Sequence, residues 1–229
     1  MSQWLRHVWY DINYTGSLAA FCLAWRLRTY GRTRVPRTGP LLVVSNHESF
    51  LDPPAVGASL PRRAFYFARK TLFRPAWFGA YLRSIHAVSV DQVGVAKEGL
   101  QAVLTLLKAG EAVVVFPEGE RTYTGEMQPL KPGIHLLIKR MSVPILPVGI
   151  AGAFEAFPRT RKLPRLSPLF LPATDARLTV AIGRPIPPER YKDMAREQVL
   201  EDLHGEIARM RERARLLHPR GRDKLRGAP

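Results

Sequence analysis

Residues 41–54 read LLVVSNHESFLDPP, and this stretch indicates how the rest of the chain folds. Its first five residues are apolar or small, which is typical of a strand buried on both faces of a sheet. Asp52 stands directly before two prolines, the arrangement expected where a helix begins. The stretch therefore predicts a buried strand at 41–45, a helix at 53–60 and a loop between them that contains His47.

Similar strand-like and helix-like stretches alternate along the chain. The other predicted strands are 64–68, 87–90, 112–116, 145–150 and 177–182, and the other predicted helices are 71–83, 95–108, 132–140 and 189–218. This order predicts an α/β fold with a mainly parallel sheet flanked by helices. Ligands of such sheets bind at the carboxyl ends of the strands, so the candidate site residues should follow the apolar runs.

The composition is that of a folded protein with a strong positive charge. The chain has 229 residues, of which 46% are hydrophobic, enough for one large domain or two small ones. Its single cysteine, Cys22, excludes a disulfide framework and a zinc site built from cysteines. The net charge of +16 favours a polyanionic partner: nucleic acid, an acidic membrane surface or a phosphorylated substrate.

The first thirty residues predict two short helices. Apolar side chains recur at helical spacing, first Trp4, Leu5, Val8, Trp9 and Ile12, and then Leu18, Phe21, Cys22 and Trp25. An arginine cluster follows at Arg26, Arg28, Arg32, Arg34 and Arg37. Tryptophans beside arginines are typical of a membrane interface, although two helices packed on the main domain are the alternative. The uncharged stretch 12–25 is shorter than the roughly 18 apolar residues of a membrane span.

These features predict the organisation of the chain. We expect an amphipathic helical membrane-contact motif at 1–30, a main domain at 31–218 and a basic tail at 219–229. The proline-rich, basic stretch 152–174 predicts a long surface loop. The expected location is the cytoplasmic face of the cell membrane, held peripherally (monotopic) by anionic lipids.

The first candidate catalytic group is His47 with Asp52. A carboxylate bound to one imidazole nitrogen orients the ring, and the other nitrogen then accepts a proton from a hydroxyl. The same His-x4-Asp spacing recurs at His86/Asp91 and His218/Asp223, so the spacing alone decides little. Only His47 has a buried strand before it and a helix start after it. The alternative is a capping or structural histidine.

The second candidate group follows the strand 112–116. Residues 116–122 read FPEGERT. Gly119, after Glu118, allows a sharp turn and close approach to a ligand. Arg121 offers a planar fork for phosphate or carboxylate, and Thr122 adds a hydroxyl. This combination indicates an anion pocket, and the alternative is a surface turn with a Glu–Arg ion pair.

Together, in this order, the two groups resemble the bacterial 1-acylglycerol-3-phosphate acyltransferase (PlsC-like) family over roughly residues 20–215. The family's first motif, Asn-His-x4-Asp, is matched by Asn46, His47 and Asp52. Its third motif, Phe-Pro-Glu-Gly-x-Arg-Ser/Thr, is matched within 116–122, and its fourth, an apolar strand with proline, by 143–148. The resemblance implies the glycerolipid acyltransferase fold.

The resemblance also implies the activity. His47, oriented by Asp52, deprotonates the hydroxyl of a lysophospholipid, most simply 1-acylglycerol-3-phosphate, which attacks the thioester of acyl-CoA or acyl carrier protein to give phosphatidic acid. The implied substrate-binding residues are Asn46, Glu118, Gly119, Arg121 and Thr122. The implied reaction needs no acyl-enzyme, no metal and no cofactor besides the acyl donor.

Two other interpretations stay open. The family's second motif usually ends in Asp-Arg, whereas Asp91 is followed here by Gln92, so an acceptor without phosphate is one alternative. Lys70, Arg74 and Arg83 are possible replacements for the missing arginine. The other alternative is a non-catalytic protein that binds anionic lipids or nucleic acid. We expect no nucleic-acid partner, because the basic residues form no recognisable nucleic-acid motif.

Overall fold

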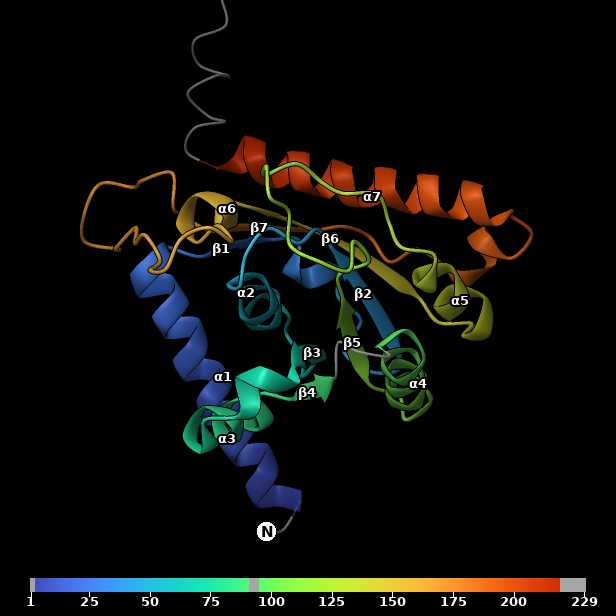
Figure 1. Cartoon of the computed structure of the whole chain (residues 1–229), viewed down its shortest axis with the longest axis horizontal. Coiled ribbons are helices and arrows are strands. Elements are labelled where there is room, and N and C mark those ends of the chain that lie inside the picture. The colour runs from blue at the N-terminus through green and yellow to red at the C-terminus, as the bar shows by residue number, and fades with distance from the viewer. Residues whose placement is uncertain (1–2, 91–94, 219–229) are drawn as a thin grey trace, which may run out of the picture.

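The centre of the molecule is a seven-stranded sheet, seen in a computed structural model that describes residues 3–90 and 95–218 (Figure 1). The strands are β1 (Arg28–Tyr30), β2 (Leu41–Ser45), β3 (Phe65–Arg69), β4 (Ala87–Val90), β5 (Ala112–Val115), β6 (Ile145–Ala151) and β7 (Thr179–Ile182). Their order across the sheet is β1-β7-β6-β2-β5-β3-β4. Neighbouring strands are parallel, except that β6 and β7 are antiparallel.

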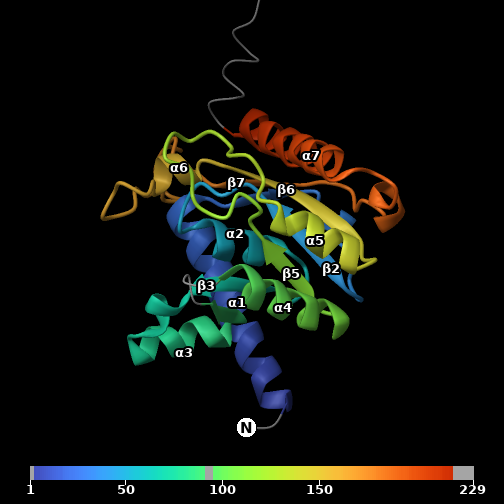
Figure 2. The same ribbon diagram turned by 45° about the vertical axis from the view of Figure 1, so that its right-hand side comes forward.

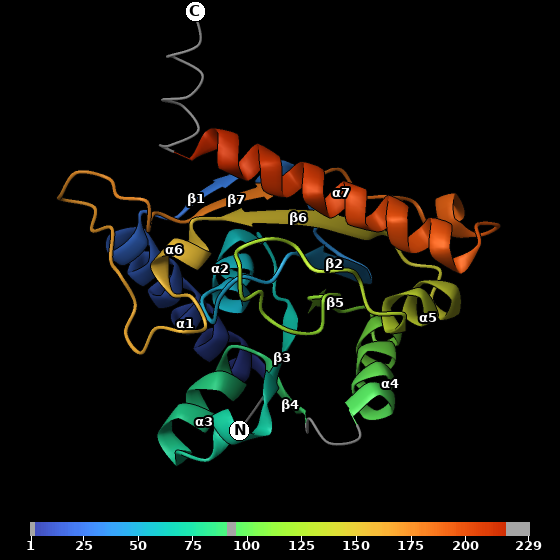
Figure 3. The same ribbon diagram turned by 45° about the horizontal axis from the view of Figure 1, so that its top comes forward.

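Helices cover both faces of this sheet, as the turned views show (Figures 2 and 3). The helices are α1 (Gln3–Trp25), α2 (Asp52–Ser59), α3 (Ala76–Ser84), α4 (Val95–Lys108), α5 (Gly133–Arg140), α6 (Ala153–Ala156) and α7 (Arg196–Leu217). One core packs α1, α2 and α3 against the sheet, and a second packs α4, α5 and α7 against the opposite face. Short 3₁₀ turns occupy Arg32–Arg34, Lys70–Phe73 and Pro188–Tyr191.

The predicted α/β class is confirmed, with local differences. The predicted helix 71–83 is two pieces, because Pro75 stands at the N-cap of α3 and the preceding residues form a 3₁₀ turn. The predicted helix 189–218 starts only at Arg196, after prolines 187 and 188. The predicted loop 152–174 contains the one-turn helix α6. Strand β1 was not predicted from the sequence, because a strand of three residues gives no clear apolar pattern.

The prediction of two short N-terminal helices is wrong, because Gln3–Trp25 is one continuous helix. The polar residues in its middle, Asn13, Thr15 and Ser17, lie within this helix. In the structure this section is anchored: the Tyr14 hydroxyl donates to the carbonyl of Leu60 at 2.7 Å, and the hydroxyls of Ser17 and Tyr81 lie 3.0 Å apart. The buried side chains of Tyr10 and Phe21 continue the packed face on both sides of it.

Among the described residues, no helix combines the length and the apolar character that crossing a bilayer requires. The predicted boundary after residue 30 does not separate two structural units, because β1 pairs with β7 inside the sheet and α1 packs against the main core. The predicted basic tail at 219–229 lies outside the described residues. A contact between residues 1–30 and a membrane stays a prediction.

Helix α7 lies directly on strand β6, and Gly149 allows this close contact. A Cβ atom added at Gly149 would overlap the backbone of Met210 and Arg211. Since the clashing atoms belong to the backbone of α7, no side-chain rotation relieves the clash. A Cβ atom added at Gly205, within α7, would have no neighbouring atom within 4 Å, so this glycine faces open space.

These two glycines predict opposite effects of the same substitution. Gly149→Ala should lower the free energy of unfolding by about 3 kcal/mol, because α7 must move away from β6. Gly205→Ala should raise it by about 0.5–1 kcal/mol, because alanine favours the helix over the unfolded chain. Equilibrium urea unfolding of both variants measures this, and equal stabilities would contradict the packing described here.

Candidate active site

The two predicted motifs lie side by side because β2 and β5 are neighbouring parallel strands. Val44 pairs with Val115, so the loops that follow the two strands leave the same edge of the sheet. A hydrogen bond joins these loops directly, since the Thr122 amide donates to the carbonyl of His47 at 2.9 Å. The candidate site is therefore at the carboxyl edge of the sheet, where the fold class predicts it.

The side chains of His47 and Asp52 form the expected pair. Nδ1 of His47 lies 2.8 Å from Oδ2 of Asp52, and Asp52 is fully buried at the start of α2. The same oxygen accepts hydrogen bonds from the backbone amides of Glu48 at 2.5 Å and Ser49 at 2.7 Å. These charge-assisted bonds hold the carboxylate in place, and the carboxylate in turn orients the imidazole.

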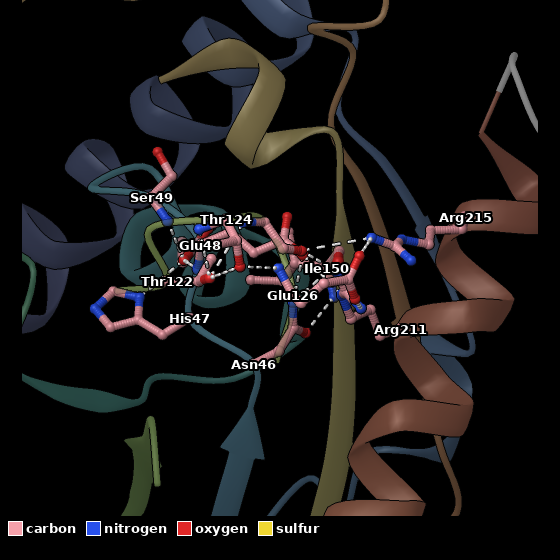
Figure 4. Close-up of polar contacts among 12 residues, drawn as sticks. Asn46, His47, Glu48, Ser49, Thr122, Thr124, Glu126, Ile150, Arg211 and Arg215 are labelled. Atoms are coloured by element: carbon pink, nitrogen blue, oxygen red, sulfur yellow. Dashed lines mark hydrogen bonds and ion pairs between the residues drawn. The ribbon is translucent and has the colours of Figure 1, made fainter. Parts of the chain in front are cut away.

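The other edge of the imidazole faces outward. The ring of His47 stacks on Phe116 with their centroids 4.3 Å apart, and 17% of its side chain is exposed. In Figure 4 this ring points away from the polar network around Glu48 and Thr122. Since Nδ1 is bound to Asp52, Nε2 is the ring nitrogen that an approaching hydroxyl can reach.

The other two His-x4-Asp matches have different surroundings. His86 lies between the rings of Tyr10 and Phe65, with centroid distances of 4.3 and 4.5 Å. Nε2 of His218 lies 2.9 Å from the carbonyl oxygen of Arg177. Their partners Asp91 and Asp223 lie outside the described residues. The geometry therefore supports His47 as the catalytic candidate.

Glu118 holds the backbone of the histidine loop, the connection at 46–51 that carries His47. Its Oε1 accepts the amide of His47 at 2.7 Å, and its Oε2 accepts the amide of Gln128 at 2.6 Å. Burial raises the pKa of Glu118, while these two hydrogen bonds oppose the shift. With both oxygens bound to backbone amides, Glu118 fixes the backbone position of His47; that it also binds substrate stays a prediction.

Asn46 and Thr122 also bind protein groups. The Asn46 side chain donates to the carbonyl of Ile150 at 3.1 Å and accepts from its amide at 2.8 Å, which extends the contact of β2 with β6. The Thr122 hydroxyl accepts from the amides of Thr124 and Gly125, both at 3.2 Å. These bonds hold the two loops, and a role of Asn46 and Thr122 in binding substrate stays a prediction. Gly119 lies within the loop that follows β5 and turns its backbone at φ +78°.

Arg121 is the predicted substrate-binding residue with an open hydrogen-bond donor. Its guanidinium lies over the ring of Phe50, 3.4 Å from the centroid, and its buried Nη1 has no hydrogen-bond partner among the described residues. Burial and the positive charges of Arg159 and Arg69 lower the pKa of Arg121. A buried cation with an unsatisfied N–H group and cationic neighbours fits an anionic ligand.

Two arginines that the sequence did not single out for this role lie near Arg121. Arg69 and Arg159 are its positive neighbours, and a contribution of Lys70, Arg74 or Arg83 in place of the missing arginine stays a prediction. Arg159 also pairs with Glu120 at 2.9 Å and lies over the ring of Tyr123. Gln92, where the family usually has arginine, lies outside the described residues.

Arg211, which was not predicted from the sequence, connects α7 to the histidine loop (Figure 4). Its Nε donates to Oε1 of Glu48 at 2.8 Å, its Nη1 donates to Glu126 at 3.0 Å, and its Nη2 donates to the carbonyl of Gly125. A signal was present: Arg211 falls on the helix stripe that buries Val199, Leu203 and Ile207. A charged residue on an apolar stripe indicates a buried partner.

No group of three or more His, Cys, Asp or Glu side chains in the described ranges is arranged to hold a metal ion. Glu48 binds Arg211, and Glu118 binds backbone amides. That the reaction needs no metal stays a prediction.

The buried Glu48 carboxyl predicts a pH-dependent stability. Burial raises its pKa from 4.5 to about 8, Asp52 adds to the shift and Arg211 opposes it. Below pH 4.5 the group is protonated in both states, and its contribution to stability is complete. Between pH 4.5 and 8 the unfolded chain releases this proton while the folded protein keeps it, so the contribution is lost as the pH rises.

Glu48→Gln should therefore flatten the decrease of unfolding free energy between pH 5 and 8, because glutamine does not titrate. Urea unfolding across this range measures the slope. The control is Glu201→Gln, a change at an exposed position of α7, which should keep the wild-type slope. Parallel profiles for Glu48→Gln and the wild type would contradict the shift.

Comparison with known proteins agrees with this site. The family model described as Acyltransferase matches residues 26–151, a range that contains both the histidine loop and residues 116–122. The crystal structure of the 1-acyl-sn-glycerophosphate (LPA) acyltransferase PlsC from Thermotoga maritima superposes with a TM-score of 0.69 at 20% identity, covering 98% of this chain and 82% of that one. This likeness establishes the shared fold.

Two curated relatives extend the comparison. The 1-acyl-sn-glycerol-3-phosphate acyltransferase of Bacillus subtilis (strain 168) is 31% identical over 127 residues, which cover 55% of this chain and 63% of that protein. The 1-acyl-sn-glycerol-3-phosphate acyltransferase alpha of Bos taurus is 31% identical over 173 residues, 73% of this chain and 56% of that protein. The matches thus span less than two thirds of these relatives.

Because the family model matches more than half of the chain and includes both motifs, this chain belongs to the acyltransferase family, as its motifs predicted.

Proposed function

We propose that the chain transfers a fatty acyl group from acyl-CoA or acyl carrier protein to the free hydroxyl of 1-acylglycerol-3-phosphate, giving phosphatidic acid. The observation that carries the proposal is the His47–Asp52 pair, with Nδ1 bound to a buried carboxylate at 2.8 Å and the opposite edge of the ring outward. The relatives named for this reaction support the choice of substrate.

The chemistry follows from this geometry. Nε2 of His47 accepts the proton of the acceptor hydroxyl, and the Asp52 carboxylate stabilises the imidazolium that forms. The oxygen attacks the thioester carbonyl, an ester bond forms and the carbon–sulfur bond breaks. The imidazolium then returns its proton to the leaving thiolate, so His47 ends the cycle neutral. Because the hydroxyl attacks directly, no acyl-enzyme is formed.

The basic cluster of Arg69, Arg121 and Arg159 supports an acceptor that carries phosphate. Arg121 has a buried, unpartnered Nη1, and its positive neighbours make an anion favourable there. Phe50, beneath the guanidinium of Arg121, belongs to the histidine loop. A phosphate bound by Arg121 would therefore place the rest of the acceptor near His47.

The outer face of α1 is the proposed contact with the membrane that holds the lipid acceptor. Val8, Trp9, Ile12 and Leu23 are exposed on this helix, whereas Tyr10 and Phe21 are buried in the core. Exposed apolar side chains on a surface helix suit peripheral insertion into the interface. The donors named above are cytoplasmic molecules, so the proposed surface is the cytoplasmic face of the membrane.

His47→Ala and Asp52→Asn should each lower kcat by about 10³- to 10⁴-fold. The first removes the base, and the second removes the carboxylate that orients the imidazole. Thiol release from acyl-CoA, measured with a thiol-reactive dye, reports the rate. His204→Ala, on α7 two turns before Arg211, is the matched control and should keep full activity. Near-normal turnover by folded His47→Ala would refute the proposed mechanism.

Arg121→Ala should reduce kcat/KM for 1-acylglycerol-3-phosphate by about 30- to 150-fold, since a charge-assisted contact is worth about 2–3 kcal/mol. Arg140→Ala, which removes an exposed charge from α5, is the control. Hydrolysis of acyl-CoA by water should persist in Arg121→Ala. An unchanged kcat/KM for this acceptor would favour the alternative of an acceptor without phosphate.

A further inference from the structure

The segment between α6 and β7 exposes an unusual amount of apolar surface. Within nine residues it presents five large apolar side chains to solvent: Leu163, Leu166, Leu169, Phe170 and Leu171. Phe170 is 86% exposed and Leu163 is 75% exposed. Scattered apolar residues are normal on a protein surface, but a group of this kind marks an interaction site. We call residues 163–171 the apolar segment.

The apolar segment is fastened to the end of α1 by its backbone. The amides of Ser167 and Leu169 donate to the carbonyls of Ala24 and Leu23 at 2.8 and 2.9 Å. The indole of Trp25 donates to the carbonyl of Arg165 at 2.8 Å. These bonds hold the segment in one place, visible as the orange loop above the upper end of α1 (Figure 1).

Arg26 satisfies further carbonyl groups of the apolar segment. Its guanidinium donates to the carbonyls of Pro168, Leu169 and Leu171. An unpaired carbonyl is costly to remove from water, so a loop with unpaired backbone groups is poorly suited to apolar surroundings. Because Arg26 binds three of these carbonyl groups, much of the free-energy cost of removing the backbone from water is offset within the protein. The exposed apolar side chains remain available to contact a partner.

Positive charge borders the apolar side chains. Arg161 and Lys162 are exposed directly before Leu163. Arg159 and Arg165 pair with Glu120 and Asp175, so their charges are partly balanced. Apolar side chains flanked by exposed cations match the boundary between anionic headgroups and acyl chains, where each cation near the surface contributes to binding.

The segment that carries these residues begins at the candidate active site. The Ser49 hydroxyl donates to the carbonyl of Phe157 at 2.8 Å, and the rings of Phe50 and Phe157 lie 5.8 Å apart. At its other end, Leu169 bonds to Leu23, whose side chain is exposed on α1. The apolar segment therefore lies next to the exposed face of α1, and it belongs to the α6–β7 connection, which contacts the histidine loop through Phe157.

We propose that residues 163–171 insert into an anionic membrane surface, with Arg161 and Lys162 on its headgroups, as a second contact beside α1. The benefit of this contact for acyl transfer rests on the proposed lipid acceptor. The binding itself needs neither substrate nor activity, so it is tested separately.

The test uses the full-length protein and sedimentation with phosphatidylcholine vesicles that contain phosphatidylglycerol. The double variant Leu163→Ser/Phe170→Ser should weaken the partition coefficient by about tenfold or more, because two large side chains lose their burial in the bilayer. The control Leu136→Ser removes an exposed leucine from α5 and should bind like the wild type. Thermal unfolding verifies that each variant is folded.

A charge variant tests the second part of the proposal. Arg161→Gln/Lys162→Gln should weaken binding to the anionic vesicles and leave the weaker binding to pure phosphatidylcholine unchanged. Unchanged partition of Leu163→Ser/Phe170→Ser would overturn the proposal. So would a wild-type dimer that this variant converts to a monomer while vesicle binding persists, because the segment would then join two copies of the chain.

A separate measurement distinguishes this proposal from the proposed function. Acyl transfer to a short-chain, water-soluble lysophosphatidate should be similar in the wild type and in Leu163→Ser/Phe170→Ser. If the wild type binds vesicles through the segment but transfers no acyl group, the proposed function fails and the membrane contact stands. If transfer is normal and binding is insensitive to the segment, only the membrane contact fails.

Discussion

One oxygen of the Asp52 carboxylate accepts the imidazole of His47 and the backbone amides of Glu48 and Ser49, and the geometry of the site depends on this convergence. The carboxylate is fully buried at the beginning of α2, so its position is set by the helix and the sheet beneath it. The three donors at Oδ2 offset part of the cost of burying this carboxylate, whose Oδ1 has no hydrogen-bond partner among the described residues. The loop that turns back over Asp52 therefore has little freedom, and the ring of His47 is oriented before a substrate arrives.

Residues far apart in the chain hold this loop from three sides. Glu118 and Thr122 bind the amide and the carbonyl of His47, while Arg211 binds Glu48 from α7. Each contact buries a polar or charged group, which alone is weak evidence of stabilisation. Their shared effect is positional, since they fix the backbone on both sides of His47. The proposed role of His47 as a base requires this precision of placement.

At the surface next to the site, apolar side chains are exposed, whereas polar groups are buried within the site. The acceptor proposed here resides in a membrane, so the protein must expose apolar side chains without exposing unpaired backbone groups. Helix α1 meets this condition through its own hydrogen bonds, and Arg26 with the last turn of α1 meets much of it for residues 163–171. Two elements separated by more than 130 residues are thereby joined side by side through backbone hydrogen bonds (Figure 1).

The sequence by itself determined the α/β class and most of the strands, because buried strands appear in it as short apolar runs. It also determined the His47–Asp52 pair, because the two residues are only five positions apart. It also indicated Arg121 through a short motif. Only the tertiary structure decided that Asn46, Glu118 and Thr122 bind protein groups, that Arg69 and Arg159 are the cations beside Arg121, and that Arg211 reaches Glu48. These roles depend on strand order and on helix α7 crossing β6, which bring together residues that no local pattern relates. The single helix at 3–25 was missed for the same reason, since contacts with Leu60 and Tyr81 anchor its polar middle section.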